Sequence, residues 1–430
     1  MLSKIKIGNF KSIKDLELKL APLTILVGPN SSGKSTVLES IAILAQTPKL
    51  PERIARSLYG SLEYGEFTRY PSTSDFPIFD FVAHKKDMSK IITFEIHIPD
   101  VEHHDIGYMY AYMPKDGEVR QAVFANEEKL VEVGYLKVGE ATMRREFLYP
   151  EEFKKSLRPT ENPEYMLDPT CFKYDSKQEI TGQEREQIEV KSVEAQEIVK
   201  KINTMVRDIY FISAIRGEVR PLVEIGVGEL RLGTHGEGLI EILSLIFRRP
   251  GYENIARKII IWASKFGMDE IKAGWWGGQN LSSDYIDPEL QTRLNLALAS
   301  QGSRQILTII TQLFWSKPGS VIMIEEPEIS LHIEAQLELP KMFSEAIKEG
   351  KQIIVTTHSE HLILALKPLI VNGELKPEDV AIWHFEKTEE GTKADKMKLT
   401  DKGIVEGWIP SYVKAEEEIL KEWFNTLPED

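Results

Sequence analysis

Residues 28–36 read Gly-Pro-Asn-Ser-Ser-Gly-Lys-Ser-Thr, and this stretch decides the fold. It matches the pattern G-x-x-x-x-G-K-[S/T], whose glycines let successive backbone N–H groups turn toward phosphate oxygens. The largely apolar run 23–27 precedes it, as expected of a strand that is covered on both faces. Residues 37–46 follow with apolar side chains at helical spacing. The sequence therefore predicts a strand, a phosphate loop and a helix, in that order.

The loop predicts a nucleotide site. Lys34 would supply positive charge to the β and γ phosphates, and the Ser35 hydroxyl would bind Mg²⁺. A helix that starts near Ser35 would point the positive end of its dipole at the same phosphates. A coincidental glycine-rich turn is the alternative, but such turns rarely lie between a buried strand and an amphipathic helix. The predicted nucleotide-binding residues are Gly28, Pro29, Asn30, Ser31, Ser32, Gly33, Lys34, Ser35 and Thr36.

A second apolar strand is predicted at 320–324, and it runs directly into Glu325-Glu326-Pro327-Glu328. In an α/β sheet such a strand delivers carboxylates to the edge where ligands bind. Glu325 would help to hold Mg²⁺ through water, and Glu326 would polarise the attacking water. The usual first acid is Asp, so the extra methylene of Glu325 leaves direct metal contact open. An acidic loop after a core strand is the alternative.

A third element is Thr356-Thr357-His358-Ser359, at the end of the apolar run 352–357. The His358 imidazole could hydrogen-bond the γ-phosphate. An isolated histidine after a strand is usually a surface or capping residue, but His358 follows Glu326 by 32 residues, across one predicted helix and one strand. This spacing favours the catalytic interpretation, and the predicted catalytic residues are Lys34, Glu326 and His358.

Apolar strands alternate with helices along the chain, which predicts an α/β fold with a mixed central sheet and flanking helices. We expect an amino-terminal lobe at 1–98 and a carboxyl-terminal lobe with a helical region at 205–400. An inserted α+β region of unknown role lies between them at 99–204, and a helical tail at 401–430.

Local patterns predict further elements. Alternating residues indicate half-buried strands at 4–7 and 16–20, and the polar stretch 176–201 could be helical. The sequence Gly274-Trp275-Trp276-Gly277-Gly278 is interpreted as a loop. Helices are expected at 239–247, 253–266, about 303–315, about 332–349 and about 416–424.

The chain has 430 residues, a formal net charge of −14 and one cysteine, Cys171. A single cysteine excludes an internal disulfide framework or a multi-cysteine metal cluster, as expected in a reducing cytoplasm. The negative charge disfavours a broad DNA surface, which needs Lys and Arg to displace counterions from phosphates, but a local basic groove stays open. No secretion signal and no run of about 18 apolar residues occur. We therefore expect a soluble, cytoplasmic protein with no membrane partner.

The phosphate loop, acidic strand and switch histidine, in this order, resemble the ABC-type ATPases, whose fold is a P-loop NTPase. Ser300, Gln301, Gly302 and Ser303 open a predicted helix just before the acidic strand, as does the signature motif of that family. There the motif contacts the γ-phosphate of ATP bound to the partner subunit. The usual double glycine is absent here, and an ordinary N-cap is the alternative. Ser330-Leu331-His332 resembles the loop that meets its counterpart across a dimer.

Within that superfamily the chain looks most like the RecF, SMC and OLD branch. Residues 5–13 resemble a strand and turn in which side chains equivalent to Lys11 and Ser12 approach the nucleotide base. The glycine-rich turn 233–239 also resembles that branch. Residues 80–85 lie where the branch carries its Gln loop, and His84 would replace that Gln near the metal. A plain surface loop is the alternative.

The resemblance implies an ATPase that uses ATP and Mg²⁺, forms a homodimer on ATP binding and switches an effector or nuclease partner. The setting would be DNA maintenance or defence against phage and plasmids. DNA binding is implied by the family alone; Arg216, Arg220 and Arg231 offer charge, yet phosphate contacts or salt bridges are their more usual roles. Many relatives carry a long coiled coil or a Toprim nuclease domain. Neither is expected here, because no sustained heptads occur and only about 70 residues follow His358.

Two other functions stay open on the sequence. The nucleotide-binding subunit of a membrane transporter should carry a clear Gln loop and a regular signature, and the long insertion with its degenerate signature disfavours it. A structural module that binds ATP with little turnover differs from the first hypothesis only in its rate of hydrolysis.

Overall fold

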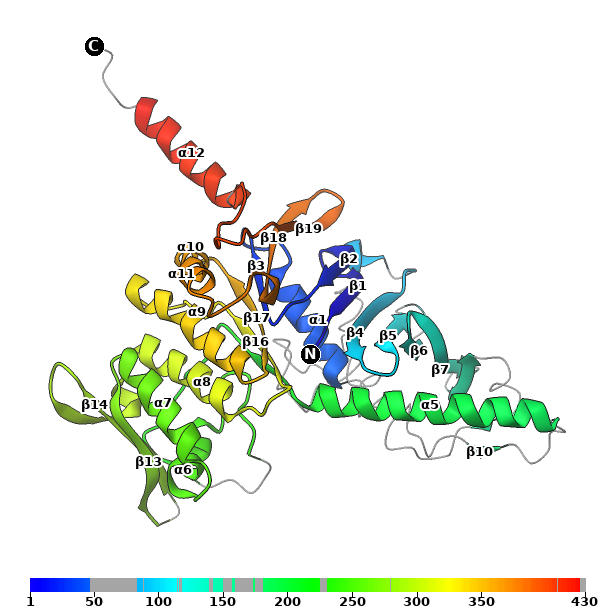
Figure 1. Cartoon of the computed structure of the whole chain (residues 1–430), viewed down its shortest axis with the longest axis horizontal. Coiled ribbons are helices and arrows are strands. Elements are labelled where there is room, and N and C mark those ends of the chain that lie inside the picture. Colours follow the sequence, from blue (N-terminus) through cyan, green and yellow to red (C-terminus); the bar gives the residue numbers. More distant parts are fainter. Residues whose placement is uncertain are drawn as a thin grey trace. The chain divides into compact units, whose positions relative to one another are not determined.

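The computed structural model divides the chain into two compact units (Figure 1). The first combines Met1–Leu20, Ser31–Ile209 and Glu386–Lys393, and the second Ala21–Asn30, Tyr210–Phe385 and Ala394–Asp430. The structure describes residues 1–46, 83–87, 89–113, 115, 118–138, 142–149, 157–158, 173–174, 181–224, 230–278, 280–407 and 409–425. Cys171 and positions 80–82, the first half of the expected Gln loop at 80–85, lie outside these described residues.

The first unit is built on an antiparallel seven-stranded sheet in the order β2-β1-β4-β5-β6-β7-β8. Its strands are β1 (Lys4–Phe10), β2 (Ile13–Lys19), β4 (Ile92–Asp100), β5 (His104–Met113), β6 (Glu118–Ala125), β7 (Glu128–Val138) and β8 (Thr142–Tyr149). The strands predicted near 4–7 and 16–20 are confirmed. Strands β5 to β8 come from the expected inserted region, and they continue the sheet that the amino-terminal strands begin.

Two helices pack against this sheet, α1 (Lys34–Gln46) and α5 (Gly182–Arg207). Helix α1 contacts β1 and β4, and α5 contacts β6 and β7. The helix expected within 176–201 is thereby confirmed, although it begins later and ends later. Short elements in this unit are the single-turn helix η1 (His84–Lys86) and the two-residue strands β9 (Leu157–Arg158) and β10 (Lys173–Tyr174).

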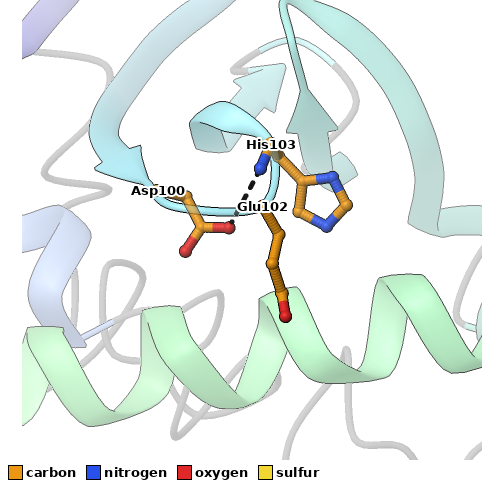
Figure 2. Close-up of side chains that lie close together, drawn as sticks. All are labelled: Asp100, Glu102 and His103. Carbon is orange, nitrogen blue, oxygen red and sulfur yellow. Dashed lines mark hydrogen bonds between the residues drawn. The ribbon is translucent and has the colours of Figure 1, made fainter.

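Ion pairs join the turn between β4 and β5 to helix α5. Asp100, Glu102 and His103 lie together at this turn, and the His103 backbone N–H donates to Asp100 (Figure 2). Lys201 of α5 places its Nζ 2.9 Å from Asp100 Oδ1 and 2.8 Å from Glu102 Oε2. Because this ammonium already forms ion pairs with both carboxylates, we assign the cluster a structural role as the anchor of the turn.

The second unit contains a six-stranded sheet in the order β11-β16-β17-β3-β18-β19. Its strands are β3 (Leu23–Val27), β11 (Ile209–Ile212), β16 (Val321–Glu325), β17 (Gln352–Thr357), β18 (Val380–Thr388) and β19 (Gly391–Met397). Strands β16, β17, β3 and β18 are parallel neighbours, and every residue of the first three is buried. This burial on both faces explains their continuous apolar sequences.

The helices of this unit pack on its strands and on one another in a common apolar core. They are α6 (Leu239–Arg248), α7 (Glu253–Lys265), α8 (Gln301–Trp315), α9 (Ile333–Lys348), α10 (Glu360–Leu364) and α11 (Leu366–Val371), with single turns η3 (Leu296–Leu298) and η4 (Pro377–Asp379). Helix α12 (Pro410–Asn425) follows near the carboxyl end. The helices predicted from the sequence are all present. None of the helices described is long and apolar enough to cross a bilayer.

The prediction of a loop at 274–278 is wrong. Residues up to Gly277 belong to β13 (Asp269–Gly277), which pairs with β14 (Asn280–Asp287). The same small sheet contains β12 (Val223–Glu224) and β15 (Thr292–Asn295). Tryptophan favours strands, whereas the glycines mark only the turn between β13 and β14, where Gly277 and Gly278 have φ of 142° and 57°.

Candidate active site

Three of the sequence elements leave the central sheet of the second unit at the same edge. Val27 at the end of β3 is in register with Thr357 at the end of β17, and Thr356 is in register with Glu325 at the end of β16. The next residues along the chain are Gly28, His358 and Glu326. The edge at which parallel strands end is where α/β sheets bind ligands.

The loop 28–33 has the backbone that phosphate binding requires. Gly28 has φ +145°, and a Cβ atom there would lie 2.3 Å from the main-chain oxygen of Phe385. Gly33 has φ +105° and Ser31 has φ 60°, so the loop contains the positive-φ residues that let a backbone turn its N–H groups toward a phosphate. Lys34 opens α1, which carries no acidic residue in its first turn. The residues present therefore fit a nucleotide phosphate.

The two acids at the end of β16 occupy different environments. Glu325 is 1% exposed, and its Oε2 accepts a hydrogen bond of 3.2 Å from the backbone N–H of Ala214, which follows β11. Glu326 is half-buried with φ +42°, an uncommon backbone conformation for a residue with a side chain. Its Oε1 lies 3.8 Å from Nε2 of His358. The structure thus brings Glu326 and His358 together.

Arg216 binds the main chain of the acidic segment 325–327, a role that the sequence did not predict. It is 5% exposed, and its Nη1 donates to the main-chain oxygens of Ser213 (2.9 Å) and Glu325 (2.8 Å). Its Nη2 donates to the oxygens of Glu326 (3.1 Å) and Pro327 (3.3 Å). Burial lowers the pKa of Arg216 to about 10, against the opposing effect of the nearby glutamates. The guanidinium is therefore charged at neutral pH and is committed to this loop, not to DNA.

Glu328 connects the acidic segment to the histidine loop. Its Oε1 accepts hydrogen bonds from the backbone N–H of His358 (2.7 Å) and from Thr357 Oγ1 (2.8 Å). Burial raises the pKa of Glu328, and these hydrogen bonds oppose the rise. One carboxylate thereby fixes the main chain at His358.

The signature-like segment lies against the loop 330–332. Ser300 caps α8 by accepting a hydrogen bond of 3.1 Å from the Ser303 N–H, while Ser300 and Gln301 are exposed. A Cβ atom at Gly302 would lie 2.3 Å from the main-chain oxygen of Ser330, so only glycine permits this approach. The predicted N-cap of α8 is therefore present, and the contact of this segment with a partner's nucleotide stays a prediction.

Loop 330–332 is also joined to the histidine loop. Gln336 of α9 donates to the Leu331 oxygen (3.0 Å) and accepts a hydrogen bond of 2.6 Å from the Ser359 hydroxyl. The residue after His358 and the loop expected at a dimer contact are thus connected through one side chain.

In the first unit, Lys11, Ser12 and His84 lie together beside α1. Lys11 has φ 50° and forms an ion pair with Glu39 of α1. Its main-chain oxygen lies 3.1 Å from Nδ1 of His84, which is 5% exposed. Because His84 is enclosed in this contact, its predicted role near a metal would require the ring to turn outward, and that role remains a prediction.

The sequence of this chain matches the AAA ATPase domain family over residues 1–218 and 172–363. The chain belongs to this family. A 44-residue stretch is 43% identical to the OLD nuclease of Thermus scotoductus, and covers 10% of this chain and 8% of that protein. The predicted identity as an ABC-type ATPase of the RecF, SMC and OLD-like branch is confirmed, and so is the predicted α/β P-loop fold. As a member, the chain is an ATP-binding ATPase.

Solved SMC head domains are among the similar structures. The SMC head bound to the C-terminal winged-helix domain of ScpA is 13% identical, covering 93% of this chain and 98% of that one with a TM-score of 0.49. The SMC head of Thermotoga maritima is 11% identical, with coverages of 93% and 99% and a TM-score of 0.42.

Proposed function

We propose that this ATPase binds ATP with Mg²⁺, dimerises on ATP and uses hydrolysis to switch a partner in DNA maintenance or in defence against phage and plasmids. The observation that carries the proposal is the common sheet edge from which Gly28, Glu326 and His358 emerge. Membership of the ATPase family supports it.

The nucleotide would be held by residues 28–36, with Lys34 on the β and γ phosphates and the turn at Lys11 and Ser12 near the base. Mg²⁺, which neutralises charge on the transferred phosphoryl group, would be held by Ser35 and, through water, by Glu325. The bond from the Ala214 N–H to Glu325 supports this assignment, because it fixes the direction of the carboxylate.

Glu326 would accept the proton of the attacking water. Unlike Glu325, its side chain is partly exposed and can reach a water molecule. His358 would hydrogen-bond the γ-phosphate and orient Glu326. The distance of 3.8 Å between Glu326 Oε1 and His358 Nε2 supports the choice of these two side chains. Arg216 and Glu328 would position the pair without touching the substrate.

A second copy of the chain would complete the site by presenting Ser300, Gln301, Gly302 and Ser303. Their position at an exposed helix amino terminus supports this, since its dipole and N–H groups favour a phosphate. Efficient hydrolysis would then require the dimer. The partner protein is proposed to be an effector or nuclease, and DNA binding would be tested by a salt-dependent titration with and without ATP.

The variant Glu326→Gln tests the proposal. It keeps the size of the side chain but cannot accept the proton, so ATP hydrolysis should fall at least about 100-fold. ATP binding should persist, and light scattering should detect a dimer that forms with ATP and does not dissociate. Normal hydrolysis by this variant would refute the assignment. Wild-type protein that binds ATP but does not hydrolyse it would favour a structural role for the nucleotide.

A further inference from the structure

The hairpin between β18 and β19 reaches the phosphate loop within the first unit. Residues 386–393 of this hairpin belong to that unit, together with Ser12 and Ser32. The Thr392 hydroxyl lies 2.9 Å from the main-chain oxygen of Ser32 and 2.8 Å from Oγ of Ser12. The Thr392 backbone N–H donates to the Ser12 oxygen at 2.7 Å. One residue, 360 positions away along the chain from Ser32, therefore contacts both segments.

The two contacts of the Thr392 hydroxyl depend on a single proton. A hydroxyl has one hydrogen, and a carbonyl oxygen can only accept. The Thr392 hydroxyl is the donor in both contacts, so its one hydrogen is shared between the Ser32 oxygen and Oγ of Ser12. The Ser12 side chain is held in one orientation by this contact.

The contact also explains why glycine occupies positions 33 and 391. A Cβ atom at Gly33 would lie 2.5 Å from Oγ1 of Thr392, so the threonine occupies the space that a side chain would need. A Cβ atom at Gly391 would lie 2.8 Å from the Ser12 oxygen and 3.0 Å from Cε1 of His84. Both glycines have a φ above +100°; Gly33 makes room for the Thr392 side chain, and Gly391 lets its backbone approach that of Ser12.

We propose that Thr392 is a positioning residue of the nucleotide site, which joins the phosphate loop to the turn expected beside the base. This inference rests on the proposed binding of ATP by the loop. Thr392 is 5% exposed and Ser32 is 1% exposed, so their hydrogen bond is shielded from water. Removing the hydroxyl would leave a buried carbonyl without its donor, a loss that an open loop would not suffer.

The experiment compares Thr392→Val with Thr392→Ser in the full chain, using a fluorescent ATP analogue and steady-state hydrolysis. Valine keeps the shape and removes both hydroxyl bonds, so Kd and KM for ATP should rise about 5- to 50-fold while kcat stays within about 3-fold. Serine keeps the hydroxyl and should bind within about 3-fold of wild type. A general loss of stability would not produce this separation of KM from kcat.

Thr388→Val is the matched control, because Thr388 donates to the Gly391 oxygen at 2.8 Å within the same hairpin and has no hydrogen bond to the loop among the described contacts. It should bind ATP like the wild type. If Thr392→Val fails to fold, Ser12→Ala removes the other end of the link and should still weaken binding.

The outcomes separate the two proposals. Wild-type protein that does not bind ATP would refute the proposed function itself. Wild-type protein that binds ATP, together with a folded Thr392→Val that binds equally well, would refute only the role of Thr392. Equal weakening in the serine and valine variants, or in Thr388→Val, would also overturn that role, because the effect would not come from the hydroxyl.

Discussion

Nη1 of Arg216 donates a hydrogen bond of 2.8 Å to the main-chain oxygen of Glu325. The same guanidinium reaches the oxygens of Glu326 and Pro327, so a single buried cation fixes three successive peptide groups. Glu326 has a positive φ, and such a conformation persists only where its surroundings hold it. Arg216, in the loop after β11, stabilises this conformation through its hydrogen bonds to the main chain.

We predict that Arg216→Lys separates hydrolysis from binding. Lysine has one point of positive charge and cannot reproduce the planar fork that bonds several oxygens. We expect kcat to fall about 10- to 100-fold, because Glu326 would be misplaced. Kd for ATP should change little, since the described hydrogen bonds of Arg216 all go to residues 213 and 325–327 and not to residues 28–36. Stopped hydrolysis assays and analogue binding would check this.

Arg220→Lys is the control for this prediction, because Arg220 is exposed and lies four residues further along the same loop. Its variant should retain kcat and should change the free energy of unfolding by less than about 0.5 kcal/mol. Equal effects at both arginines would show that loop charge, not the contact with the acidic segment, controls hydrolysis.

Glu328 predicts a pH dependence of stability. Burial raises its pKa from the ordinary 4.5, so over a window above pH 4.5 the folded state binds more protons than the unfolded state. Stability from this group therefore decreases as pH rises through that window. Glu328→Gln has no such proton, and its melting temperature relative to wild type should increase as pH rises from 4.5 toward neutral. A constant difference across this range would show that Glu328 does not titrate as described.

Gly302→Ala tests the contact between the signature-like segment and loop 330–332. The new methyl group would lie 2.3 Å from the Ser330 oxygen, so backbone must move. We expect a loss of about 1–3 kcal/mol in the free energy of unfolding, as for other overpacked sites. ATP-dependent dimerisation should weaken as well. Gly182→Ala, where no atom of the described residues lies within 4 Å of the added methyl group, should have no such effect. Chemical denaturation with light scattering would compare the two.

Much of this site could be predicted because its signals are local. Apolar runs such as 23–27 and 352–357 encode buried parallel strands, and the motifs that follow them mark the ends that meet at one edge. Arg216 could not be found in this way, because arginine is rarely buried and its partners are main-chain oxygens that leave no trace in composition. The Thr392 contact joins residues 360 positions apart, and no periodicity reports such pairing.

The error at Trp275 and Trp276 has a similar cause. Flanking glycines suggested a loop, yet Trp275 pairs with Leu281 of β14, and Trp276 lies in the same strand at a register shift. The antiparallel strands β5 to β8 were indistinct in the sequence because tertiary pairing, more than local propensity, defines them.

The central claim is that two copies of the chain share each hydrolysis site, and mixing two inactive variants tests it most directly. Lys34→Ala removes the cation of the phosphate loop. Ser300→Asp keeps a residue able to cap α8 but places a carboxylate where the partner's γ-phosphate is expected. Each variant alone should be nearly inactive. In an equimolar mixture, half of the dimers are mixed and each has one intact site, so about a quarter of wild-type hydrolysis should return. A mixture that stays inactive, or Ser300→Asp with wild-type activity, would contradict the account.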